Sequence, residues 1–240
     1  MDKNLSQLLK WSIEAQTSGT GNDNTTTTNN SSNSDGQASA PAPAPAPAPA
    51  PRSDLTPEIL ASILGGPSDA ELMQQSMAVI TSADPEVSLE HKLVAFDNFE
   101  QLIESLDNAN NMANLALWTP LLQQLSHEES EMRKYAAWCV GTAVQNNEKS
   151  QERLLAAGGL PSLVKAVLSD DEAVDVRRKA VYALSSATRN YQPAMDVVTA
   201  ELEKGGHIKE GTGKVDATNM DAVDVVMDGL KELVKQKASA

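Results

Sequence analysis

The chain has few aromatic residues and almost no cysteine. Its 240 residues include only two Phe, three Tyr and three Trp. A hydrophobic core must therefore be packed mainly from Leu, Val, Ala, Ile and Met. The single cysteine, Cys139, excludes an intrachain disulfide. Its place within a helical pattern predicts a packed thiol.

The chain is also poor in basic residues. It carries 19 Lys and Arg against 33 Asp and Glu, which gives a formal net charge of −14. Affinity for nucleic acids rests on Lys and Arg side chains that neutralise phosphates, so this balance argues against a nucleic-acid partner. The sequence shows neither a secretory signal nor a long apolar run. We therefore expect a cytoplasmic protein that does not engage a membrane.

No constellation of residues typical of catalysis is present. The three histidines are scattered and lack metal-ligand spacing: His91, His127 and His207. Gly211–Lys214 resembles a phosphate-binding loop only superficially, because Val215 follows the lysine and no strand precedes the glycines. The many Asp and Glu residues lie mostly where helices start or turn, where they cap and solvate. The sequence thus predicts a protein that is not an enzyme and that binds no metal or cofactor.

The sequence does contain a repeated helix. Glu131–Asn147 combines an apolar side of small and medium residues with a polar side that has Trp138 at its centre. A shift of 44 residues places Asp175–Asn190 on this helix and Tyr182 on Trp138, and a shift of 41 residues the other way aligns the helix around Phe99. A helical period of about 40–47 residues is typical of armadillo and HEAT repeats. This predicts an all-α, armadillo-like repeat superhelix, with an unrelated helical bundle as the alternative.

The pattern divides the chain into four segments. Residues 1–16 form a short helical segment, and residues 17–54 form a disordered linker of Thr, Asn and alternating Ala-Pro. Residues 55–204 carry the repeats, and residues 205–240 a loop and a last amphipathic helix. We expect the linker to act as an extended spacer and the last helix to cap the apolar end of the stack.

Apolar spacing and capping residues predict where the helices of the repeat domain lie. The longer helices are expected at Ser68–Ile80, Ser88–Leu106, Glu129–Asn146, Glu172–Asn190 and Asp221–Gln236. Asp107–Asn111 is expected to break the first repeat, with a short helix at Met112–Leu117 after it.

The long helices of such a stack line its concave side. The repeat shifts predict this lining one helix at a time: Asp97, Gln101 and Glu104; then Trp138, Thr142 and Gln145; then Tyr182, Ser186 and Arg189. Aromatic and arginine side chains are favoured anchors of protein interfaces, which suggests a partner-binding surface. The alternative is that both aromatic rings only cover the edge of the core.

Several stretches resemble a known family. The longest is the run KLVAFDNFEQLIESLDNANN at Lys92–Asn111, and others are QLLKWSIEAQ near the start, SMAVI at Ser76–Ile80, GTAVQNN at Gly141–Asn147 and DVRRKAVYALSSATRN at Asp175–Asn190. In this order and spacing they resemble the fungal armadillo-type nucleotide-exchange factors of cytosolic 70-kDa heat-shock chaperones. These factors are relatives of the animal heat-shock-protein-binding proteins.

The resemblance implies a function for the concave face. Family members embrace a lobe of the chaperone's ATPase domain, accelerate the release of ADP and so promote release of bound polypeptide. The implied face here includes Asn108 and Ala109 besides the residues above. We expect a monomer whose partner is this ATPase domain. Longer family members continue with further clear repeats, whereas this chain becomes glycine-interrupted after Asn190.

The resemblance also implies a role for the N-terminal segment, which in the family keeps released polypeptide from rebinding. Its apolar residues here are Leu5, Leu8, Leu9 and Trp11. The alternative for this segment is a helix that packs on its own domain. The alternative for the whole chain is an armadillo-type adaptor that binds an extended peptide in its groove.

Overall fold

The computed structural model describes residues 65, 67–208 and 214–238, and Pro67–Ala240 form one compact unit. Within the described residues the regular structure is entirely helical. The helices are α3 (Asp69–Ile80), α4 (Leu89–Ile103), α5 (Leu106–Asn111), α6 (Trp118–Gln123), α7 (Ser130–Val144), α8 (Glu148–Ala156), α9 (Gly159–Leu168), α10 (Val174–Thr188), α11 (Gln192–Lys204) and α12 (Met220–Ala238), with a 3₁₀ turn at Gln124–Ser126. The predicted all-α, armadillo-like fold is confirmed.

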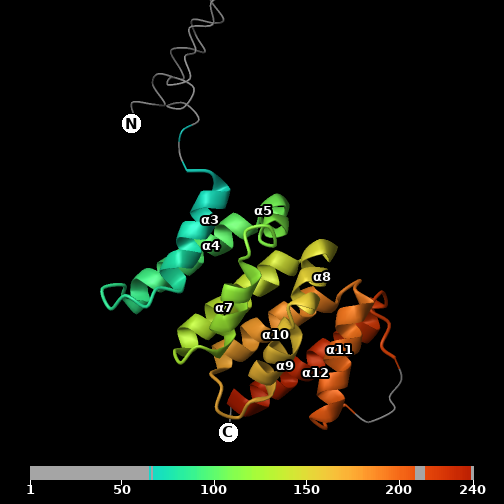
Figure 1. Cartoon of the computed structure of the whole chain (residues 1–240). Coiled ribbons are helices and arrows are strands. Elements are labelled where there is room, and N and C mark those ends of the chain that lie inside the picture. Colours follow the sequence, from blue (N-terminus) through green and yellow to red (C-terminus); the bar gives the residue numbers. More distant parts are fainter. Residues whose placement is uncertain (1–64, 66, 209–213, 239–240) are drawn as a thin grey trace, which may run out of the picture. The chain divides into compact units, whose positions relative to one another are not determined.

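Three long helices form a row, in which α7 packs between α4 and α10 (Figure 1). They run in the same direction. The ends of α4 and α7 lie together, because Thr142 near the end of α7 donates a hydrogen bond to Glu100 near the end of α4. Gln145, just after α7, accepts a hydrogen bond from Tyr182 of α10. The shorter helix α9 packs on α10, with α8 and α11 against α9. This arrangement is that of stacked helical repeats.

The core follows the predicted repeat register. In α7 the small and medium apolar side chains are at most 1% exposed: Met132, Ala136, Val140 and Ala143. Their counterparts one repeat later are buried as well: Ala180, Leu184 and Ala187. Cys139 is also fully buried, as the sequence predicts. Because so many of these side chains are small, the helices can approach closely and pack without large voids.

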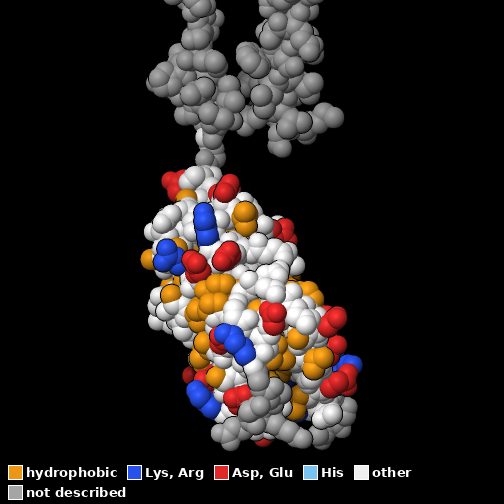
Figure 2. Space-filling model, turned by 90° about the vertical axis from the view of Figure 1, so that its right-hand side faces the viewer, with side chains coloured by type: hydrophobic (Ala, Val, Ile, Leu, Met, Phe, Trp, Pro, Cys, Tyr) orange, Lys and Arg blue, Asp and Glu red, His pale blue; other side chains and the backbone are white. Residues whose placement is uncertain are grey.

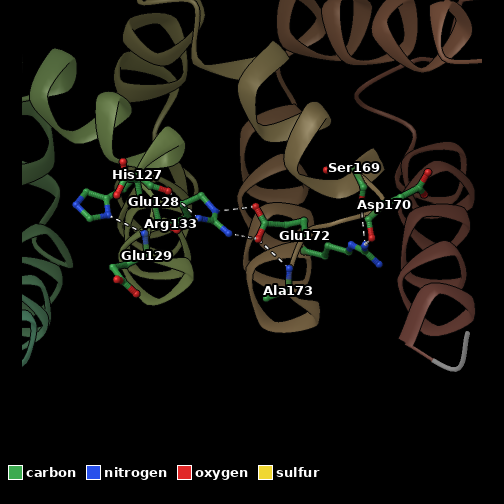
Figure 3. A network of polar contacts seen from close by, with 9 residues as sticks. His127, Glu128, Glu129, Arg133, Ser169, Asp170, Glu172 and Ala173 are labelled. Carbon is green, nitrogen blue, oxygen red and sulfur yellow. Dashed lines mark hydrogen bonds and ion pairs between the residues drawn. The ribbon is translucent and has the colours of Figure 1, made fainter.

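Arg133 joins two repeats (Figure 3). Its Nη1 donates to the backbone carbonyl oxygens of His127 and Glu128, both at 2.7 Å, which closes the turn before α7. Its Nε and Nη2 donate to the two carboxylate oxygens of Glu172, at 2.8 and 2.7 Å, in the turn before α10. A two-point contact of this kind fixes both distance and orientation. It therefore holds the starts of α7 and α10 in register.

Arg177 repeats half of this arrangement 44 residues later. Its Nη2 donates to the carbonyl oxygens of Ser169 and Asp170, at 2.7 and 2.9 Å, and so closes the turn before α10. The side chain is 2% exposed, and its Nε and Nη1 find no hydrogen-bond partner among the described residues. Arg133 pairs with a carboxylate of the following repeat, whereas Arg177 has no such carboxylate partner among the described residues.

The final helix, α12, packs on the far side of α10 but runs in the opposite direction. Asp224 near its start pairs with Arg189 at the end of α10, and Lys237 near its end pairs with Asp170 before α10. It buries one apolar stripe: Val223, Met227, Leu230 and Val234. A predicted capping helix therefore lies at the end of the row, as an antiparallel cap and not as a fourth repeat helix.

Two local expectations are wrong. The segment expected to break the first repeat forms α5, because Ala109 buries its side chain there at 2% exposure. The short helix expected at Met112–Leu117 is a turn, in which Ala116 adopts a left-handed φ of 54°. In addition, α8 was not foreseen, although the Asn147 side chain caps its start by accepting from the Ser150 amide.

Some expectations fall outside the described residues. They include the segment 1–16, the linker 17–54 and the start of the repeat domain at residue 55. Among the helices that are described, none is long and apolar enough to span a membrane. On the side that carries α5, α8 and α11, charged side chains of both signs are scattered between apolar ones (Figure 2). The basic side chains drawn there form no continuous patch.

Gly141 sets how closely α7 and α10 approach. A Cβ at this position would lie 2.4 Å from Tyr182 Cε1 and 3.1 Å from the Ala183 Cα. In α12, by contrast, a Cβ at Gly229 would meet nothing within 4 Å. Alanine favours a helix over glycine by about 1 kcal/mol, whereas overpacking costs about 1–3 kcal/mol. An alanine should therefore be destabilising at Gly141, where crowding is the larger effect, and stabilising at Gly229, where helix propensity is the larger effect.

Accordingly, Gly141→Ala should lower the free energy of unfolding by up to about 2 kcal/mol, because α10 has to move away and this cost exceeds the gain in helix propensity. The matched control Gly229→Ala should raise it by roughly 0.4–1 kcal/mol. Urea unfolding followed by circular dichroism measures both. Stabilisation of similar size in both variants would show that α7 and α10 are not packed as closely as described.

Candidate partner-binding site

The outward sides of α4, α7 and α10 enclose a hollow of about 500 Å³. Its lining comes from all three helices: Glu100, Glu104, Trp138, Thr142, Gln145, Asn146 and Tyr182. Five of these seven residues were predicted from the repeat shifts. Glu100 and Asn146 were missed. Glu100 could have been found, because it lies three residues after Asp97 and four before Glu104, on the same side of a helix.

Trp138 takes part both in the hollow and in the packing around it. Its side chain is half-buried, and its ring centre lies 5.6 Å from that of Tyr135. The Nζ of Lys179, from α10, lies 3.6 Å from the centre of the Trp138 ring. Cation–π contact of this kind holds an ammonium group over the ring. The Trp138 ring is therefore fixed on two sides while it still lines the hollow.

Tyr182 forms the boundary between α7 and α10 on this face. Its ring lies against Gly141, where the missing side chain leaves room for it. Its hydroxyl donates to Gln145 Oε1 at 3.2 Å, and Lys179 Nζ lies 5.9 Å from its ring centre. The half-buried ring is thus held in place before any partner arrives.

Glu100 gives the hollow a negative charge close to its wall. The residue is only 6% exposed, and its Oε1 accepts a hydrogen bond from the Thr142 hydroxyl at 2.6 Å. Burial, with a smaller contribution from the Glu100 carboxylate, raises the pKa of the Cys139 thiol well above its ordinary value. Burial also lowers the pKa of Lys179, and the attraction of Glu100 opposes that shift.

A second groove of about 370 Å³ lies between α10 and α12. Tyr182 borders it too, together with Arg178, Val181, Ser185, Lys231, Val234 and Lys235. Its three charged residues are all basic, whereas both charged residues of the hollow are acidic. The repeat shifts could not reveal this groove, because α12 does not repeat the pattern of α10.

The remaining predicted residues lie elsewhere. Asp97 and Gln101 sit on α4, where Gln101 Nε2 donates to Asp97 Oδ2 at 3.0 Å, but neither lines the hollow. Ser186 is half-buried, and its backbone carbonyl accepts from Gln151 Nε2 at 2.9 Å. None of these three residues therefore lines the hollow with Trp138.

Three further predicted residues are engaged within the fold. Arg189 pairs with Asp224 and so ties α10 to α12. Asn108 Nδ2 donates to Asp69 Oδ2 at 2.8 Å and to the Leu102 carbonyl oxygen at 2.9 Å. The Ala109 side chain lies in the core. None of the three lines the hollow.

The four apolar residues predicted for the N-terminal segment lie outside the described residues: Leu5, Leu8, Leu9 and Trp11. As for metals, the described residues contain no group of three or more His, Cys, Asp or Glu that could hold an ion.

Two family models together cover most of the chain. The model described as "Nucleotide exchange factor Fes1" matches residues 5–112, and the model described as "SIL1/FES1/HPBP1 C-terminal domain" matches residues 108–207. A protein of Gibberella zeae named "Hsp70 nucleotide exchange factor FES1" is 61% identical over 234 residues, which are 97% of this chain and 98% of that protein. The chain belongs to the Fes1 family.

Two more Fes1 relatives are similar in sequence to this chain along almost its whole length. "Hsp70 nucleotide exchange factor fes-1" of Neurospora crassa is 56% identical over 98% of this chain and 99% of its own length. "Hsp70 nucleotide exchange factor FES1" of Coccidioides immitis is 44% identical over 97% of this chain and 99% of its own length. These matches span almost all of each relative.

Proposed function

We propose that the chain is a nucleotide-exchange factor for a cytosolic 70-kDa heat-shock chaperone, and that it binds the chaperone's ATPase domain. The observation that carries the proposal is membership of the Fes1 family, whose relatives bear the name Hsp70 nucleotide exchange factor. The hollow of α4, α7 and α10 supports it, because its half-buried aromatic rings suit a protein interface. We further propose that the chain acts in the cytosol as a monomer.

The proposed action requires binding and no chemical step, so we propose that the chain is not itself an enzyme. An exchange factor must bind one conformation of the ATPase domain more tightly than the other. Weakening the binding of ADP to the chaperone 1,000-fold requires about 4.1 kcal/mol of coupling between ADP and the exchange factor. Since coupling is reciprocal, ADP must weaken the binding of the factor by the same ratio. A standard interface of about 1,600 Å² is large enough to provide this energy.

A rigid binding face favours such coupling. Trp138 is held by Tyr135 and Lys179, and Tyr182 by Gly141 and Gln145. Side chains that are already fixed lose little conformational entropy on binding, so more of the contact energy is available to bias the chaperone. Ion pairs between repeats, such as Arg133–Glu172, also make the stack of helices resist bending. The stack therefore adapts its shape poorly to the chaperone conformation that it binds less tightly.

An adaptor for an extended peptide is the weaker alternative. Such a groove would present a regular ladder of similar side chains along many repeats. Here the equivalent positions carry Asp97, Trp138 and Tyr182, which differ in chemistry. The row of parallel helices also ends at α10, because α12 runs in the opposite direction.

The first test is the release of fluorescent ADP from a purified cytosolic 70-kDa chaperone, measured by stopped flow. Adding the protein should accelerate release until the rate saturates. Trp138→Ala should shift the saturation to higher protein concentration, because a half-buried interface anchor is lost. The exposed outer residue Glu152, changed to Ala, serves as the matched control and should leave the curve unchanged. No acceleration at saturating protein would refute the proposal.

For the N-terminal segment we propose a separate role in keeping released polypeptide off the chaperone. Deletion of residues 1–51 should then leave ADP release largely intact and slow the release of bound polypeptide. Fluorescence anisotropy of a labelled peptide on the chaperone measures the second step. Equal loss of both activities would contradict a separate role, and so would no loss of either.

A further inference from the structure

We propose that Lys179 is a positioning residue for chaperone binding. It does not touch the chaperone itself but holds the Trp138 ring in the orientation that the docked lobe contacts. This inference rests on the proposed function and adds a residue that acts on the binding face from outside the lining of the hollow. It is carried by the place of the Lys179 ammonium group between aromatic rings of two repeats.

The Lys179 ammonium group interacts with all three helices of the row. Its Nζ lies 3.6 Å from the centre of the Trp138 ring in α7 and 5.9 Å from that of Tyr182 in its own helix, α10. A cation within about 6 Å of a ring centre is attracted to the ring face, and tryptophan attracts it most strongly. The Glu100 carboxylate of α4 attracts the same ammonium group. A single side chain of α10 thus connects one residue from each long helix.

The position of Lys179 repeats that of Tyr135, 44 residues earlier. Tyr135 reaches back from α7 to Phe96 of α4, with the ring centres 5.9 Å apart, just as Lys179 reaches back from α10 to Trp138 of α7. In both repeats this position therefore braces an aromatic ring on the preceding long helix. Phe96 is fully buried, whereas Trp138 lines the hollow, so the contact made by Lys179 ends at the binding face.

Trp138 needs this contact because its ring is only half-buried. Tyr135 limits it from within α7, where the two rings lie 5.6 Å apart at a tilt of 41°, and Lys179 limits it from α10. Without the ammonium group, the ring can turn about its side-chain torsions. An interface side chain that must first be ordered loses affinity for the partner. Lys179 therefore affects chaperone affinity through the order of the Trp138 ring.

The test compares Lys179→Met with Lys179→Arg. Methionine keeps an unbranched chain and removes the charge, whereas arginine keeps a cation that stacks on aromatic rings. The half-saturation concentration and the maximal rate of accelerated ADP release from the chaperone are measured for each variant. We expect Lys179→Met to raise the half-saturation concentration about three- to tenfold at an unchanged maximal rate, and Lys179→Arg to restore most of the loss. The control Lys149→Met, which removes an exposed cation from α8, should change neither quantity.

A double-mutant cycle separates action through Trp138 from a direct contact. If Lys179 acts through the ring, Lys179→Met combined with Trp138→Ala binds the chaperone as weakly as Trp138→Ala alone, because the positioned ring is already absent. A contact between Lys179 and the chaperone, or a general loss of structure, would instead add its own factor to that of Trp138→Ala. Additive losses would overturn the positioning role.

The free protein offers a spectroscopic readout of the same role. In protein labelled with 5-fluorotryptophan, the ¹⁹F resonance of Trp138 is assigned by its loss in Trp138→Phe. It should shift and broaden in Lys179→Met and stay unchanged in Lys149→Met. The resonance of the buried Trp118 in α6 should not move, which excludes a general change of the fold. An unchanged Trp138 resonance in Lys179→Met would contradict the proposal.

The outcomes distinguish this inference from the function on which it rests. If the wild type accelerates ADP release and Lys179→Met has the same half-saturation concentration, the positioning role is overturned and the exchange function stands. If the wild type neither binds the chaperone nor accelerates release, the exchange function itself fails, and the role of Lys179 in it fails as well.

Discussion

The close, parallel packing of α7 against α10 is the contact on which the rest of the binding face depends. Because Gly141 has no side chain, the Tyr182 ring lies on α7 and its hydroxyl reaches Gln145. Trp138, one turn earlier in α7, then lies under Lys179 of α10. With the helices further apart, neither contact would form and the hollow would lose a wall. Arg133 and Glu172 fix the same pair of helices at the other end.

Much of this could be predicted from the sequence, because packing imposes a period on it. Small apolar residues at helical spacing, repeated after 44 residues, indicated which sides of α7 and α10 are buried. The opposite sides then had to be exposed, which placed Trp138 and Tyr182 together. Glu100 was missed because the repeat shift followed only selected positions, although helical geometry places it between Asp97 and Glu104.

Other features depend on contacts that no period encodes. The direction of α12 is set by single pairs, such as Arg189 with Asp224, so sequence could indicate the helix but not its orientation. The same pair explains why Arg189 is tied within the fold. The asparagine-rich stretch around Ala109 suggested a break, yet one buried methyl group and tertiary bonds of Asn108 hold it as helix. Tertiary contacts override weak local preferences here.

The central claim is that the hollowed side of the α4, α7 and α10 row contacts the chaperone. Because Cys139 is buried, a cysteine introduced at the exposed Gln145 can be labelled selectively with a photo-crosslinker. Irradiation with the chaperone's ATPase domain should crosslink the two proteins from this position and not from Glu152→Cys in α8. Crosslinks from residue 152 alone, or none from 145 while the complex forms, would contradict the account.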